Sequence, residues 1–361
     1  MNHSGRLPSR MPVKQYCRGF AQYSVCEKVI TMVSRISALL FMSVLLGTAA
    51  FAQPPESKAS PDEMKAAQAI MAAPDPAKKL KAGEDFIKKF PKSTIRPRVA
   101  HGLVQQISAV TDAGQKVTLA QEFQQAFDEP SEQDAIVSVL LDGLLQAKRS
   151  DEAFTTGAAY LGKNPDALMV LIQLLATGAE EAKNKNTKFV TQSLQYGKHA
   201  IELIDAGKKP ADIDDAAWTK YKADTMPSIY QSLGLLNLVS GDRAQAVANY
   251  SKASELAPND VFNVLMLGQM LNGDYQDQAK RYQGMPSGAA KDEELKKTQA
   301  LLDKVIDAYA RAVAMSEGDT RYGQVRAQFL QDLESYYKYR HNGSNAGMQE
   351  LINKYKPAPK P

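Results

Sequence analysis

The chain has 361 residues, with 44 Lys and Arg against 40 Asp and Glu and a formal net charge of +4. Residues 1–52 hold six of the basic residues and one acidic residue, Glu27, so this segment carries +5 and the remainder about −1. The remainder therefore lacks the excess positive charge with which proteins bind nucleic acids or anionic membranes. Both cysteines, Cys17 and Cys26, lie in the same segment. Disulfides, thiolate metal sites and cysteine nucleophiles are thus excluded from residues 53–361.

The N-terminal segment has the pattern of a secretory signal peptide. Arg35 is followed by an apolar run at 36–46 and by Ala50-Phe51-Ala52, which matches a signal-peptide cleavage box. We expect cleavage after Ala52 and export to a bacterial periplasm. Stable membrane insertion is not expected, because the apolar run is too short for a comfortable span. An uncleaved membrane anchor is the alternative.

Composition divides the rest of the chain. Residues 1–31 exceed an ordinary signal n-region, so Met32 is an alternative start of the protein. A Pro/Ser/Lys linker at 53–60 precedes a helical domain at 61–355. The tail at 356–361 is too rich in proline to be helical, and we expect it to be disordered.

Helical periodicity dominates residues 61–355, and no alternating pattern of useful length indicates a strand. Four prolines, at 91, 130, 165 and 258, each close an apparent second helix of a pair, and the first two intervals are 39 and 35 residues. Proline is tolerated there because it follows a helix end and begins the next turn. The spacing predicts a chain of helix pairs.

The stretch 227–260 resembles one unit of the tetratricopeptide repeat (TPR) family, whose pattern is W-x2-L-G-x2-Y…A-x3-F…P over 34 residues. The matching residues are Tyr230, Leu233, Gly234, Ala246, Tyr250, Ala253 and Pro258. Tyr230 replaces the family's Trp, and Asn237 replaces the second aromatic residue. The resemblance implies two helices joined at Gly241-Asp242, crossing closely where the small residues lie. Such a unit needs neighbours to bury its apolar face.

Two later intervals are long. The pattern Val264-x2-Leu267-Gly268 follows in phase, but its partner around Val305 and Tyr309 arrives 25 residues late. Extended helices explain this, because the extra residues are good helix formers. We expect long hairpins at 167–206, with a turn near 184–186, and at 261–316, with a turn at 284–288. A final pair spans 321–341 and 346–355. Before the best repeat, Pro227 either kinks one long helix, which we favour slightly, or begins a new one.

The expected fold is therefore all-α: a TPR-like α-solenoid of about seven antiparallel helix pairs, two of them extended hairpins. Enzymatic activity is not expected, and neither is a cofactor or metal. The stretch from Gly157 to Asn164 imitates a phosphate-binding loop, but Asn164 stands where magnesium needs Ser or Thr. His101, His199 and His341 are far apart and lack metal-ligand spacing.

A cluster of aromatic residues near the C-terminus leaves two interpretations open. Tyr322, Tyr336, Tyr337 and Tyr339, with Arg340, either bind a ligand by stacking or fill the last inter-repeat core. We favour the core, because the terminal unit of a solenoid must seal it.

In TPR arrays, ligands lie along the concave face of the first helices. The resemblance places six residues on that face: Gln231, Leu235, Leu238, Phe262, Leu265 and Gln269. Apolar and amide side chains suit a segment of a partner protein, whereas the Lys, Arg and Asn of a chaperone-tail clamp are missing. We expect a non-enzymatic scaffold or adaptor. The alternatives are an assembly subunit of an outer-membrane or envelope complex, and a periplasmic hydrolase with its site in the groove.

Overall fold

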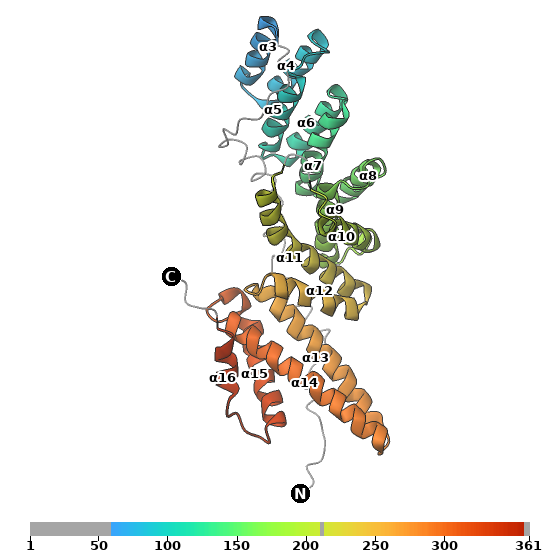
Figure 1. Ribbon diagram of the computed structural model, residues 1–361, viewed down its shortest axis with the longest axis vertical. Helices are drawn as coiled ribbons and strands as arrows, with labels where there is room; N and C mark the ends of the chain where they lie inside the picture. Colours follow the sequence, from blue (N-terminus) through green and yellow to red (C-terminus); the bar gives the residue numbers. More distant parts are fainter. Residues whose placement is uncertain (1–58, 210–212, 357–361) are drawn as a thin grey trace. The chain divides into compact units, whose positions relative to one another are not determined.

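The computed structural model describes residues 59–209 and 213–356 (Figure 1). The predicted signal segment, both cysteines and residues 357–361 of the predicted tail lie outside the described residues. All regular secondary structure in the described part is helical, with 14 α-helices and one short 3-10 helix. The helices are α3 (Pro61–Ala72), α4 (Pro76–Lys89), α5 (Arg96–Ser108), α6 (Ala113–Ala126), α7 (Pro130–Gln146), α8 (Ser150–Leu161), α9 (Leu168–Lys183), α10 (Val190–Asp205), α11 (Asp215–Ser240), α12 (Arg243–Leu256), α13 (Val261–Gly284), α14 (Ala289–Met315), η3 (Thr320–Tyr322), α15 (Gly323–Arg340) and α16 (Met348–Lys354).

Local chemistry explains where the helices begin. Ser60 and Glu63 form a reciprocal capping box at the start of α3, with Pro61 as the first helical residue. Aspartate side chains accept a hydrogen bond from a backbone N–H at the starts of five other helices, α4, α6, α11, α12 and α13. The four prolines at 91, 130, 165 and 258 each follow the end of a helix, as predicted.

The chain contacts divide the described residues into two units. The N-terminal unit contains residues 59–177 and 198–203, and the C-terminal unit contains residues 178–197 and those from 204 onward. Helices α9 and α10 contribute to both. Each unit is described by itself.

In the N-terminal unit, each helix from α3 to α7 packs against the next one in the chain, and α7 packs against α8. Helix α5 also contacts α7, so the first helices of two successive pairs lie against each other. The core includes Leu103, Phe123 and Phe127, and the last two rings stack with centroids 4.3 Å apart. This pairing of helices with chain neighbours and with the next pair is consistent with a helical repeat.

In the C-terminal unit, α11 continues through Pro227 as one helix, which is the alternative we favoured. Proline removes the hydrogen bond to the carbonyl four residues earlier, at Ala223. Ala223 is exposed, so water can satisfy this carbonyl. The helix ends at Gly241, whose φ of 88° suits glycine, and Asp242 caps α12.

The same close contact occurs in two successive helix pairs of this unit. A Cβ atom on Gly234 of α11 would lie 2.9 Å from the Tyr250 ring of α12. A Cβ atom on Gly268 of α13 would lie 3.1 Å from the Tyr309 ring of α14. The glycines are 34 residues apart and the tyrosines 59, so the second partner does arrive 25 residues late. The extra residues extend α13 and α14 to 24 and 27 residues, as predicted.

The C-terminal aromatic cluster lies in the core. Tyr322, Tyr336 and Tyr337 are buried together with Phe329, while Tyr339 packs at the edge. Arg340 is held at that edge by two hydrogen bonds, of 2.6 and 2.9 Å, from its guanidinium to the Asp303 carboxylate. These positions confirm the interpretation that the cluster fills the core.

Candidate functional site

The six residues of the predicted binding face lie on α11 and α13, the first helices of two successive pairs in the C-terminal unit. A buried hydrogen bond of 2.9 Å, from Gln231 Nε2 to Asn263 Oδ1, joins the two helices. Neither amide is exposed to water, so losing one partner would leave the other unsatisfied, at a cost of about 1–3 kcal/mol. The hydrogen bond therefore fixes how the two helices lie against each other.

The structure separates the six residues into two groups. Gln231, Leu265 and Gln269 are buried, and Leu265 belongs to the large core cluster of α13, α14 and α15. The half-buried residues are Leu235, Leu238 and Phe262. Only this second group offers apolar surface to a partner, and we call it the apolar face.

The apolar face rests on a small core. Leu238 and Phe262 pack against Ala246, Tyr250, Met266 and Met270, and the Phe262 ring meets the Tyr250 ring edge-on at 6.4 Å between centroids. The inner side of each residue is thus fixed by packing. Because its support is rigid, the exposed side of the face can bind without first paying to order these side chains.

Two polar groups beside the face were missed by the sequence analysis. Tyr336 of α15 donates a hydrogen bond of 2.9 Å to Asn272 Oδ1 and accepts one of 2.8 Å from Gln276 Nε2. This network joins α15 to α13. Its sequence signal is only an amide on the helix face that also carries Gln269, which does not reveal the tyrosine partner.

Arg243 forms a second polar edge. Its guanidinium lies against Gly273 of α13, where a Cβ atom would come within 2.3 Å of Nη2. The same guanidinium pairs with Asp274 at 3.4 Å and with Asp277 at 2.9 Å. Burial raises the pKa of Asp274, although the charge of Arg243 opposes the rise. Glycine at 273 is required because any side chain would displace the arginine.

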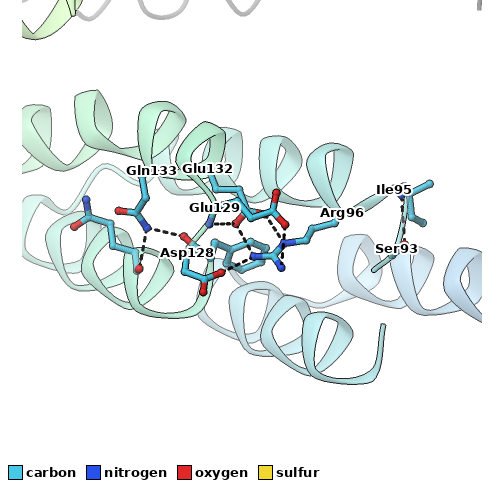
Figure 2. Close-up of polar contacts among 9 residues, drawn as sticks. Ser93, Ile95, Arg96, Asp128, Glu129, Glu132 and Gln133 are labelled. Carbon is cyan, nitrogen blue, oxygen red and sulfur yellow. Dashed lines mark hydrogen bonds and ion pairs between the residues drawn. The ribbon is translucent and has the colours of Figure 1, made fainter. Parts of the chain in front are cut away.

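The N-terminal unit holds a separate cluster of charged residues at the start of α5 and α7. Figure 2 shows Arg96 surrounded by three carboxylates. Arg96 donates to both oxygens of Glu132, at 2.7 and 2.8 Å, and to Asp128 at 3.0 Å, and its Nη1 lies 3.4 Å from Glu129. The side chains of Arg96 and Glu132 are only 10% and 3% exposed. Hydrogen bonding to Glu132 raises the pKa of Arg96, and hydrogen bonding from Arg96 lowers the pKa of Asp128.

The surroundings of this cluster fix the helix ends. Gln133 donates to the Gln124 and Phe127 carbonyls at 2.9 and 2.6 Å, which ties α7 to the end of α6 (Figure 2). Since its own protein supplies carboxylates to both sides of the guanidinium, Arg96 does not present a vacant fork to a ligand. The cluster fastens α5 to α7.

Groups that could suggest catalysis have local structural partners. The ring nitrogens of His199 face Asp166 and Glu202, the His101 ring faces the Gln105 amide, and His341 stacks on Tyr337. Gly162 lies at the end of α8, and Gly157 packs against Leu174. Within residues 59–209 and 213–356 no group of three His, Cys, Asp or Glu residues is placed to hold a metal ion. None of the described helices is both long enough and apolar enough to cross a membrane.

Comparisons with family models and with curated proteins gave no match.

Proposed function

We propose that the protein is a TPR-like scaffold that binds segments of partner proteins on the apolar face formed by Leu235, Leu238 and Phe262. One observation carries the proposal: these apolar side chains remain partly exposed on two successive first helices, which the Gln231–Asn263 hydrogen bond holds together. Apolar side chains that stay exposed as a group typically mark an interaction site.

The surroundings favour a protein segment over a small molecule. The polar groups at the edges, Arg243 and Asn272, are already paired with Asp274, Asp277 and Tyr336. An apolar strip with satisfied polar edges suits an extended or helical segment that inserts apolar side chains. No set of described residues is arranged as a nucleophile, base and orienting group, and so binding, without catalysis, is the activity we propose.

The proposal includes export to the periplasm. It is supported by the apolar run at 36–46 and the Ala50-Phe51-Ala52 box. Sequencing the N-terminus of protein recovered from the periplasm tests it: a mature chain beginning at Gln53 is expected, and a chain that retains residues before Ser37 would contradict it.

The binding proposal is tested by crosslinking in intact cells. A photo-crosslinking residue at position 235 should capture a defined partner, and the same residue at Leu256, an exposed apolar position on α12, should not. The double variant Leu235→Ser, Phe262→Ser should lose this partner, while Leu256→Ser should keep it.

Folding must be measured on the same variants. Because Leu235 and Phe262 are only half-buried, we expect the double variant to keep its helicity and to melt cooperatively at a modestly lower temperature. Loss of the folded state together with the partner would assign both residues to the core and remove the proposal.

A further inference from the structure

Helix α3 in the N-terminal unit carries two exposed methionines. Met64 is 39% exposed and Met71 is 46% exposed, and they are two of the four exposed large hydrophobic residues in the described part of the chain. Seven residues separate them, which is two helical turns, so they lie on the same face of α3.

Both methionines reach the same face of α5. Met64 Sδ lies 3.6 Å from Arg98 Nη2, in a weak hydrogen bond. A Cβ atom on Gly102 would lie 2.9 Å from the Met71 methyl carbon. Arg98 and Gly102 are one turn apart on α5, so the four residues form a continuous surface across both helices. We call it the methionine face, and it consists of Met64, Met71, Arg98 and Gly102.

Single exposed hydrophobic residues are ordinary on protein surfaces. The methionine face differs because its two methionines share one helix face and are both supported by α5. Glycine at 102 contributes to this, since a side chain there would displace the Met71 methyl group.

The two arginines of α5 are in contrasting states. Arg96 is buried among three carboxylates, as Figure 2 shows. Arg98, two residues later, is exposed, and none of the described residues places a carboxylate within ion-pair distance of it. Its guanidinium therefore stands beside the methionines with donors that can accept an external carboxylate.

We propose that the methionine face binds an acidic amphipathic helix of a partner protein. Methionine side chains are flexible and polarisable, and they adapt to the apolar ridge of a helix. Two turns of helix rise about 10.5 Å, so apolar residues seven apart on the partner match the spacing of Met64 and Met71. A carboxylate on the partner then pairs with Arg98, whose planar fork fits it. This surface is separate from the apolar face, and either proposal can fail without the other.

The test uses the full mature chain and two synthetic peptides of about 18 residues, a length at which helix formation is favourable enough to measure. One peptide has Leu on one helix face and Glu on the other, and its counterpart has Lys in place of Glu. Fluorescence anisotropy measures binding. We expect the acidic peptide to bind more tightly than the basic one, and to weaken with added salt because its charge contact with Arg98 is exposed.

Methionine methyl groups labelled with ¹³C locate the binding site. The acidic peptide should shift the NMR signals of Met64 and Met71, assigned with the variants Met64→Leu and Met71→Leu. The signals of Met266 and Met270, buried in α13, should stay unchanged. Binding without a shift at Met64 and Met71 would overturn the proposal, and so would the absence of binding.

Substitutions separate the apolar and charged contributions. The double variant Met64→Gln, Met71→Gln should weaken binding on the order of tenfold, which corresponds to about 1.4 kcal/mol. Arg98→Gln should remove the preference for the acidic peptide. Leu256→Gln, at 43% exposure on α12, is the matched control and should change neither. Equal affinity of both peptides for the unsubstituted protein would overturn the acidic character of the proposed partner.

Discussion

At the scale of single residues, His199 is held in its charged form by two carboxylates. Its Nε2 lies 2.9 Å from Asp166 Oδ1, just before α9, and its Nδ1 lies 3.2 Å from Glu202 Oε2 on the same helix. A neutral imidazole can donate from only one nitrogen, whereas the imidazolium donates from both. Hydrogen bonding to Glu202, together with that to Asp166, therefore raises the pKa of His199.

This geometry predicts a pH dependence of stability. Because the folded-state pKa of His199 lies above its unfolded value of about 6.5, its stabilisation is complete below that pH and is lost as the pH rises through the folded-state pKa. The stability difference between the unsubstituted protein and His199→Gln should thus be larger at about pH 5.5 than at about pH 8.5. Urea denaturation at both pH values measures it.

A second histidine provides the control. His101 is also exposed, and its ring faces the Gln105 amide. The variant His101→Gln should show a smaller change in this difference between the two pH values. If both variants follow the same pH dependence, the two carboxylates do not hold the His199 proton.

At the scale of helices, the pairs are fixed by close crossings. In α11 and α12, Gly234 faces the Tyr250 ring, and Ala253, one turn further along α12, is completely buried. Small residues at such positions let two helices approach until the large neighbours fill the remaining space. The contact depends on the absence of a few atoms, and adding them should be costly.

Enlarging either residue should therefore destabilise the protein. Ala253→Leu overpacks the crossing and should cost on the order of 1–3 kcal/mol, because the surrounding core cannot expand without strain. Gly234→Ala should also destabilise, since its methyl group would collide with two atoms of the Tyr250 ring. Ala248→Leu, at an exposed position on α12, should stay within about 0.5 kcal/mol of the original stability. Urea denaturation measures all three, and a neutral effect of Ala253→Leu would show that the crossing tolerates added volume.

The sequence predicts the helix pairs well where the signals are local. The Gly241-Asp242 turn and the prolines after helix ends act through neighbouring residues, so their effect does not depend on the rest of the fold. The contact of Arg96 with Glu132 spans 36 residues. Nothing near either residue identifies the other, and the sequence analysis missed this cluster.

The binding face shows the same limit. Helical periodicity places Leu235 and Leu265 on the first helices, but periodicity does not say which neighbour covers them. The structure leaves Leu235 half-buried and encloses Leu265 in the cluster that includes Phe329 and Leu333 of α15. Burial depends on the packing of a helix about 60 residues later, which no local pattern specifies.

At the scale of the whole molecule, the extended hairpin of α13 and α14 is a repeat unit with an addition. Eight residues after Gly234, and eight before Tyr250, the chain of the shorter pair turns at Asp242. Eight residues after Gly268 and before Tyr309 are Gln276 and Leu301, where the longer pair continues outward. Beyond these two positions only Ala279 and Thr298 are buried. The added segment thus packs mainly on itself.

Removing the added segment should therefore leave a folded protein. If residues 277–300 are replaced by Gly-Asp, the turn returns to the position that it has in α11 and α12, and the core residues Tyr275 and Leu302 stay in place. The loss includes the exposed ion pair of Arg243 with Asp277, which contributes about 0–1 kcal/mol. We expect cooperative urea unfolding with a smaller m-value, because less surface becomes exposed. A deeper replacement, of residues 273–304, removes Tyr275 and Leu302 as well and should abolish cooperative folding. If the shorter replacement behaves like the deeper one, the added segment is part of the core that holds the repeat together.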